Sequence, residues 1–181
     1  MFFNLTEKRR SIRKYSPRPV EPEKIDLIME AALRAPSSRS ICPWEFIVIT
    51  DSGILDKLSK SKPHGATFLK DAPLGIVVCA DRLKCDVWIE DASIAATFIH
   101  LAATDLGLGS CWIQIRKRDH DKNITAGEFI SDLLDLPDTL EILAIVAIGY
   151  PDEKKMPRSR DSLDFEKISY NMYGVKKSAG H

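Results

Sequence analysis

Continuous apolar runs and helically spaced apolar positions divide this chain into segments of two kinds. The continuous runs predict buried β-strands at 44–50, 75–80, 110–115 and 140–149. Apolar residues three and four positions apart predict helices from Pro22 to before Pro36, over about 87–105 and from Thr125 to Leu134, with shorter helices after Asn4 and near 55–58. A chain of 181 residues can bury one substantial core, so one compact domain is expected.

Local signals indicate where these helices begin and end. Asn4–Glu7 and Thr125–Glu128 both have the spacing of a capping box. Pro22 suits the first turn of a helix, where its missing N–H leaves no hydrogen bond unmade. Gly107 can take the left-handed conformation that closes the helix at 87–105. That helix is rich in alanine, serine and threonine, so neighbouring elements can approach it closely, and it is the candidate central helix.

Polarity separates the last part of the chain from the rest. We expect a packed domain over residues 1–150 and a C-terminal extension over 151–181, which is polar and carries Arg158 and Arg160. Basic and acidic residues balance at 26 each, which argues against nucleic acid or an anionic membrane as a partner. The first residues lack the pattern of a signal peptide, and no apolar run is long enough to span a bilayer, so a cytoplasmic location is expected.

Two groups of cations stand far apart in the sequence. The segment 9–13 carries three arginines and a serine, a composition that suits a phosphate through charge-assisted hydrogen bonds. Arg158 and Arg160 repeat this chemistry near the end of the chain. On spacing alone, a solvated basic face explains the first group as well, and a surface pair explains the second.

The loop at 35–43 offers several hydroxyl groups between a helix and a strand. It suits hydrogen bonding to a polar ligand, although a turn with local side-chain to backbone bonds is an equally simple explanation. Trp44 after it is more often a core residue than a stacking platform. The cysteines and histidines lack metal-ligand spacing, and no nucleophile or phosphate-loop motif is present, so no metal site and no catalytic side chain is predicted.

Motifs in a fixed order give the most specific signal in the sequence. They are Arg9-Arg-Ser-Ile-Arg13, Ala35-Pro-Ser-Ser-Arg-Ser-Ile-Cys-Pro-Trp44, Leu106-Gly-Leu-Gly-Ser-Cys-Trp-Ile-Gln114, Ala147-Ile-Gly-Tyr-Pro151 and Arg158-Ser-Arg160. Each is weak alone, but together they resemble the nitroreductase family of flavoenzymes over about residues 5–160. The resemblance implies an α+β fold with a central mixed β-sheet flanked by helices. It also implies a homodimer in which the C-terminal arm is exchanged and FMN is bound at the subunit interface.

The resemblance assigns cofactor contacts residue by residue. Phosphate-binding positions match Arg9 and Ser11, with Arg10 in the same run, and the position facing the pyrimidine end of the flavin matches Arg13. The loop that meets the flavin from the partner subunit matches Pro36, Ser37, Ser38 and Ser40. The strand end near flavin N5 matches Ile113 and Gln114, and the cations that close over the phosphate match Arg158 and Arg160. A cation near the pyrimidine end would stabilise the charge that builds there on reduction.

The chain departs from the family's usual pattern at three positions. Ser40 stands in place of an asparagine and Cys42 in place of a glutamine, which shortens or removes their hydrogen bonds to the flavin. Ile115 stands where many relatives carry glycine, and would narrow the space beside the ring. The chain is also short for the family, and lacks the long helical insertion with which larger members line the substrate pocket.

The implied function is an FMN-dependent oxidoreductase. NADH or NADPH would deliver a hydride to flavin N5, and a small electron-poor acceptor such as a nitroaromatic or a quinone would then take its place. Other flavin reactions on the same fold, reductive dehalogenation and flavin fragmentation, stay open, as does a non-catalytic FMN carrier or sensor. A nucleic-acid-binding domain is a further alternative, which would show no flavin colour and a steep dependence on salt.

Overall fold

A computed structural model describes residues 2–177 of the chain; Met1 and residues 178–181, the end of the predicted extension, lie outside the described residues. The α-helices are α1 (Phe2–Lys8), α2 (Pro22–Leu33), α3 (Ser52–Ser59), α4 (Trp88–Asp105) and α5 (Ala126–Leu134). The strands are β1 (Trp44–Ile49), β2 (Leu74–Asp81), β3 (Gly109–Gln114) and β4 (Leu140–Gly149). Short 3₁₀ turns occur at Ser38–Ser40, Thr67–Asp71, Arg160–Ser162 and Phe165–Lys167.

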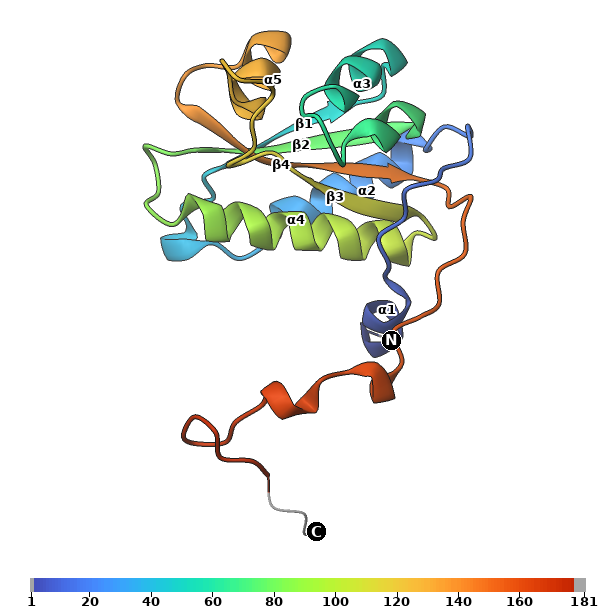
Figure 1. Ribbon diagram of the computed structural model, residues 1–181, viewed down its shortest axis with the longest axis vertical. Coiled ribbons are helices and arrows are strands. Elements are labelled where there is room, and N and C mark those ends of the chain that lie inside the picture. Colours follow the sequence, from blue (N-terminus) through green and yellow to red (C-terminus); the bar gives the residue numbers. More distant parts are fainter. Residues whose placement is uncertain (1, 178–181) are drawn as a thin grey trace.

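One sheet in the order β1-β2-β4-β3 forms the centre of the molecule. Helices α2 and α4 cover one face of it, and α3 and α5 cover the other (Figure 1). The α+β fold is therefore confirmed. The sheet is not mixed, however, because all three strand pairings are antiparallel. A parallel pairing does occur as an isolated bridge between Ser11 and Ser110, where the N-terminal segment meets the edge strand β3.

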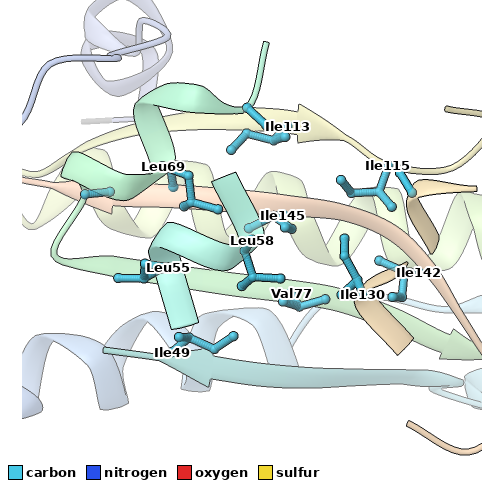
Figure 2. Packing of buried hydrophobic residues seen from close by; sticks show 14 of the residues in the cluster. Ile49, Leu55, Leu58, Leu69, Val77, Ile113, Ile115, Ile130, Ile142 and Ile145 are labelled. Carbon is cyan, nitrogen blue, oxygen red and sulfur yellow. The ribbon is translucent and has the colours of Figure 1, made fainter. Parts of the chain in front are cut away.

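Continuous apolar strands produce a core on both faces of the sheet. Strand β2 is buried along almost its whole length, as its unbroken apolar sequence requires when helices cover both sides. On the α3 and α5 face, Leu55, Leu58 and Ile130 pack against Val77 and Ile145 of the sheet (Figure 2). On the other face, small side chains of α4 let that helix lie close to the sheet, as its composition predicts.

Most of the predicted helix boundaries hold. The Thr125–Glu128 capping box is present, with the Glu128 N–H donating to Thr125 Oγ1 at 3.1 Å and the Thr125 N–H donating to Glu128 Oε2 at 2.7 Å. Pro22 begins α2, and Gly107 has the left-handed φ of 76° expected after α4. The Asn4–Glu7 capping box is wrong, because α1 begins at Phe2 and already includes Asn4.

The C-terminal segment leaves the packed body directly after β4. Tyr15 and Pro151 form an antiparallel bridge, and the Asp152 N–H donates to the Lys14 carbonyl at 2.9 Å. From there the segment passes α1 and runs away from the sheet (Figure 1). The N-terminal segment and the beginning of the C-terminal segment are thus brought side by side, and this juxtaposition builds the candidate site.

Candidate flavin site

The segment 9–13 lies against the edge of β3. The Ile12 N–H donates to the Ser110 carbonyl at 3.0 Å, next to the bridge between Ser11 and Ser110. Gly109 permits this close approach, because a Cβ there would lie 2.8 Å from Ile12 Cβ. The glycine thus places the Ser11 hydroxyl and its neighbouring arginines at the beginning of the edge strand.

The C-terminal segment brings its arginines to the same place. The Arg158 N–H donates to the Glu7 carbonyl at 3.1 Å, and Arg10 Nη1 donates to the Met156 carbonyl. A cavity of about 920 Å³ opens between the two ends of the chain. Its lining residues are Phe3, Thr6, Glu7, Arg9, Arg10, Ser11, Arg13, Lys155, Arg158, Arg160 and Leu163. Six of the predicted cofactor residues, about 145 positions apart in the sequence, therefore line one cavity.

The cavity has a strong positive charge. Within residues 2–177, none of its five arginines forms a salt bridge, whereas Lys155 pairs with Glu153 at 2.9 Å. The Arg13 N–H donates to Glu153 Oε1 at 2.6 Å, so this carboxylate fixes the backbone of the segment rather than neutralising a guanidinium. That hydrogen bond, together with one from Lys155, holds the pKa of Glu153 below its usual value. Unpaired guanidinium groups around a hydroxyl suit a phosphate group.

The free edge of β3 continues from this cavity. In an antiparallel strand, alternate residues direct their backbone groups toward the partner strand and away from it. The Ser110 carbonyl accepts from the Ile12 N–H, and the Gln114 carbonyl accepts from Lys62 Nζ at 2.8 Å, both on the side of β3 away from β4. By the same alternation, the Trp112 backbone and the Gln114 N–H also face this open edge. A planar ligand anchored at Ser11 could lie along this edge.

Ile113 and Gln114 contribute backbone rather than side chains here. The Ile113 side chain is buried in the core (Figure 2), and the Gln114 side chain accepts from Trp112 Nε1 at 2.9 Å and donates to the Arg116 carbonyl at 2.8 Å. Neither residue lines the arginine cavity. Ile115 is fully buried among the same core side chains, so the expectation that it narrows the space beside a ring is wrong.

The loop that contains Pro36, Ser37, Ser38 and Ser40 lies away from the arginine cavity. The Ser38 N–H donates to Asp91 Oδ1 at 2.8 Å, which fixes the loop to the first turn of α4. The Ser37 hydroxyl accepts from the Cys42 N–H at 2.9 Å, a local turn of the kind expected for such a sequence. Ser40 and Cys42 both have positive φ, 53° and 51°, where non-glycine residues are rare, so the shape of this loop is imposed by its contacts.

Asp91 is a residue whose role the sequence did not reveal. It lies in the first turn of α4, where an acidic side chain is favoured, and it is 2% exposed and accepts hydrogen bonds from Ser38 and from Cys85 Sγ, the latter at 3.3 Å. Arg39 adds a salt bridge to Asp86 on the same side of the loop. The small neighbours Ala92 and Ala95 were the available signal, since they leave room for the loop to approach α4.

His100 on α4 contacts the edge strand β3. Its Nδ1 is 2.7 Å from the Ser110 hydroxyl, and its ring stacks on Trp112 at 6.4 Å between centroids. Burial, and secondarily the charge of Arg9, lower the pKa of His100 to about 4. The imidazole is therefore neutral near pH 7, and it supports the strand edge without adding charge to the site.

Comparison with known proteins agrees with this geometry. The nitroreductase family model matches residues 6–62 and 55–150. An FMN-dependent nitroreductase from Clostridium difficile R20291 has a similar structure, with a TM-score of 0.93 and 49% identity over 94% of this chain and 99% of that one. A protein from Archaeoglobus fulgidus described as an NADH dehydrogenase/NAD(P)H nitroreductase is 37% identical over 88% of this chain and 91% of its own length.

A second archaeal relative extends the comparison. A protein of the same description from Methanothermobacter thermautotrophicus is 38% identical, over 88% of this chain and 81% of its own. Separately, no helix in the described part of the chain is long and apolar enough to cross a membrane. Motifs, fold and family model agree over most of the sequence, and the chain therefore belongs to the nitroreductase family of oxidoreductases.

Proposed function

We propose that this protein binds FMN along the free edge of β3 and uses NADH or NADPH to reduce small electron-poor compounds, nitroaromatic or quinone-like. The observation that carries the proposal is the convergence of unpaired arginines from both ends of the chain on one cavity beside that edge. FMN would supply the redox chemistry, accepting a hydride from the nicotinamide and passing electrons to the acceptor. The similarity to FMN-dependent and NAD(P)H-using relatives supports this choice of cofactor and reductant.

The residues of this chain would position and stabilise the cofactor. Arg9, Ser11, Arg158 and Arg160 would hold the phosphate, with Arg10 bracing the C-terminal segment through Met156. Arg13, the next cation along the edge, would stabilise negative charge near the pyrimidine ring. The backbone of Ile113 and Gln114 would border the reactive part of the ring. No side chain needs to act as acid or base, and none is assigned that role.

The proposal includes a homodimer. Pro36, Ser37, Ser38 and Ser40 lie outside the arginine cavity of their own chain, so their contact with FMN would have to come from a second copy. Exposed apolar side chains on the C-terminal segment, such as Phe165, Tyr170 and Tyr173, supply a surface that a second copy would cover. The proposal places the enzyme in the cytoplasm, where both nicotinamide reductants are available.

An absorption spectrum of the purified protein under air-free conditions tests the proposal. Flavin bands that bleach on addition of NADH or NADPH, and return on addition of a nitroaromatic or quinone, are the expected result. Bands that resist both reductants would instead support a flavin carrier. Reduction by NAD(P)H without reoxidation by these acceptors would favour another flavin reaction, and a chain that stays colourless after FMN is supplied would refute the proposal.

A further inference from the structure

A second group of cations lies at the far end of β3. Lys62 contacts the strand at Gln114, and Arg116 and Arg118 follow directly in the turn after it, where the Arg118 N–H donates to the Ile115 carbonyl at 3.0 Å. Ser11 meets the strand at Ser110 and Lys62 meets it at Gln114. These points are four residue steps apart along the strand, or roughly 13 Å. The free edge thus has cations at both ends.

Lys62 is held close to the strand in a partly buried position. Its ammonium donates to the Gln114 carbonyl at 2.8 Å, so its hydrogen-bond partner is a neutral group. Burial, followed by repulsion from Arg118, lowers the pKa of Lys62. Arg118 is therefore close enough to Lys62 for the two positive charges to repel each other.

Nothing in the described residues neutralises this group. Arg116 lies 5.9 Å from the centroid of the Trp88 ring, and Arg118 Nη1 donates to the Lys117 carbonyl at 2.8 Å. Within residues 2–177 no salt bridge involves Lys62, Arg116 or Arg118. The acids that follow in the same loop do not compensate them, because the Asp121 carboxylate accepts from the Asn123 and Ile124 N–H groups and Asp119 forms no salt bridge.

Some surface cations of this chain, in contrast, have a carboxylate partner. Arg34 pairs with Glu30 at 2.6 Å, and Lys60 pairs with Asp56 at 2.7 Å. Bringing like charges together without a counter-charge costs free energy, and such a group raises the local concentration of anions. The cations at this end of β3 are therefore available to an anionic ligand, since no carboxylate within residues 2–177 pairs with them.

We propose that Lys62, Arg116 and Arg118 form an anion subsite that binds a phosphate or carboxylate group of the molecule exchanging electrons with the bound flavin. This inference rests on the proposed function, which places the flavin along the edge between the two cationic groups. The phosphate anchor of FMN occupies the Ser11 end, so the second group faces the reactant that meets the exposed ring. The anion could belong to the pyrophosphate of a nicotinamide dinucleotide or to an acidic acceptor.

Stopped-flow kinetics of the two half-reactions, in wild type and Arg118→Gln, distinguish these sources. Arg118 is exposed, so its replacement leaves the fold intact. We measure flavin reduction by NADH and NADPH, and reoxidation by 4-nitrobenzoate and by the neutral 4-nitrobenzyl alcohol. A roughly tenfold fall in the second-order rate constant for the anionic reactant, with weaker salt dependence, is expected. A fall for the dinucleotides identifies the phosphate, and a fall for nitrobenzoate identifies the carboxylate.

The neutral acceptor and a matched variant serve as controls. Reoxidation by 4-nitrobenzyl alcohol should be unchanged in Arg118→Gln. Lys57→Gln removes one exposed cation from α3 and should leave every rate unchanged. Equal rate constants for wild type and Arg118→Gln with all charged reactants would overturn the subsite, as would an equal fall for charged and neutral acceptors.

A flavin-free measurement separates failure of the subsite from failure of the proposed function. We titrate the apoprotein with inorganic pyrophosphate by calorimetry at low ionic strength, in wild type, Arg118→Gln and Arg9→Gln. The arginine cavity and the subsite together predict two binding events, one lost in Arg9→Gln and the other lost in Arg118→Gln. If Arg118→Gln binds pyrophosphate like wild type, the subsite is refuted whether or not the protein binds FMN. Lys62→Met, which removes the partly buried cation, provides a second variant with the same expected loss.

Discussion

The sheet body and the C-terminal segment are ordered by different means. Strands β2 and β4 are buried along nearly all their length, with core side chains such as Leu58 and Ile145 fully enclosed. In the segment from Pro151 to residue 177, every residue is at least partly exposed, and large apolar side chains such as Met172 and Tyr173 stand 70% and 101% exposed. The body therefore carries its own hydrophobic stabilisation, and the segment lacks one within a single chain.

This difference matters because the candidate site draws on both regions. Ser11 and its arginines are fixed to the body through β3, whereas Arg158 and Arg160 lie on the segment that packs on little of its own chain. We infer that the body folds independently of cofactor, and that closure of the site depends on the ligand and on a second copy. The following predictions test this division.

Removal of a core side chain should have the largest effect on stability. Leu58→Ala leaves a cavity beneath α3 and should lower the free energy of unfolding by about 2–5 kcal/mol. Met172→Ala in the C-terminal segment should change it by less than about 0.5 kcal/mol at protein concentrations where the chain is monomeric. Urea unfolding followed by circular dichroism measures both. A loss in Met172→Ala that grows with protein concentration would show that the segment packs on a second copy.

As the pH falls, the sheet body should lose stability before the contacts of the C-terminal segment do. The pKa of His100 is lowered from 6.5 to about 4, so the unfolded chain binds the extra proton first as pH falls. The stability that neutral His100 contributes is complete above pH 6.5 and is lost toward pH 4, at a cost of about 2 kcal/mol between pH 7 and 5. Glu153, whose pKa is lowered from 4.5, contributes above that value and loses its contribution only at lower pH.

Substitution of His100 identifies its share of this acid sensitivity. His100→Gln keeps a hydrogen-bonding side chain beside Ser110 but cannot take up a proton in this range. Thermal unfolding at pH 7 and pH 5 should therefore show a smaller difference in the variant than in wild type. If both proteins lose stability in parallel over this interval, the assignment to His100 is wrong.

The contact between the N-terminal segment and β3 should tolerate no added methyl group. In Gly109→Ala the new Cβ would lie 2.8 Å from Ile12 Cβ, an atom too close to the backbone to swing aside. Overpacking of this kind costs about 1–3 kcal/mol, and displacement of Ser11 should weaken FMN binding as well. Gly127→Ala is the matched control, because its Cβ would meet only Thr125 Oγ1, at 3.7 Å. Equal melting temperatures for the two variants would contradict the close approach.

Surface ion pairs should contribute least to the free energy of unfolding, and their contribution should be equally small in the sheet body and in the C-terminal segment. Arg34 and Glu30 on α2 are 74% and 55% exposed, and Lys167 and Asp164 in the C-terminal segment are 82% and 53% exposed. Arg34→Ala and Lys167→Ala should each change the free energy of unfolding by less than about 0.5 kcal/mol. A larger loss in Lys167→Ala alone would mean that the segment has a packed environment that Lys167 supports.

Local signals in the sequence predict the elements well. Unbroken apolar runs locate all four strands, and the Thr125–Glu128 box and Gly107 mark helix ends that the structure reproduces. Strand direction is different in kind, because it depends on how distant segments pair. The antiparallel order of β1-β2-β4-β3 could not be derived from apolar runs that look alike in either orientation, and the expected mixed sheet was wrong.

The candidate site shows the same limit. The motif at 9–13 and the late pair Arg158 and Arg160 were recognised, and the structure brings them together around one cavity. The burial of Asp91 in the first turn of α4 could not be predicted, because it arises from a loop 53 residues away in the sequence. The charge group of Lys62, Arg116 and Arg118 was also missed, since Lys62 reaches Gln114 only through the packing of the segment after α3 on β3.

The central claim is that arginines from the N-terminal and C-terminal segments form one phosphate site. The most direct test is to titrate the apoprotein with FMN and with riboflavin, in wild type and in the double variant Arg158→Gln/Arg160→Gln. Both positions are exposed, so the fold should not change. We expect wild type to prefer FMN over riboflavin by about 100-fold or more, and the double variant to lose most of that preference while riboflavin affinity stays constant. Equal affinity of wild type for the two flavins would contradict a phosphate site in this cavity, and so would an undiminished preference in the variant.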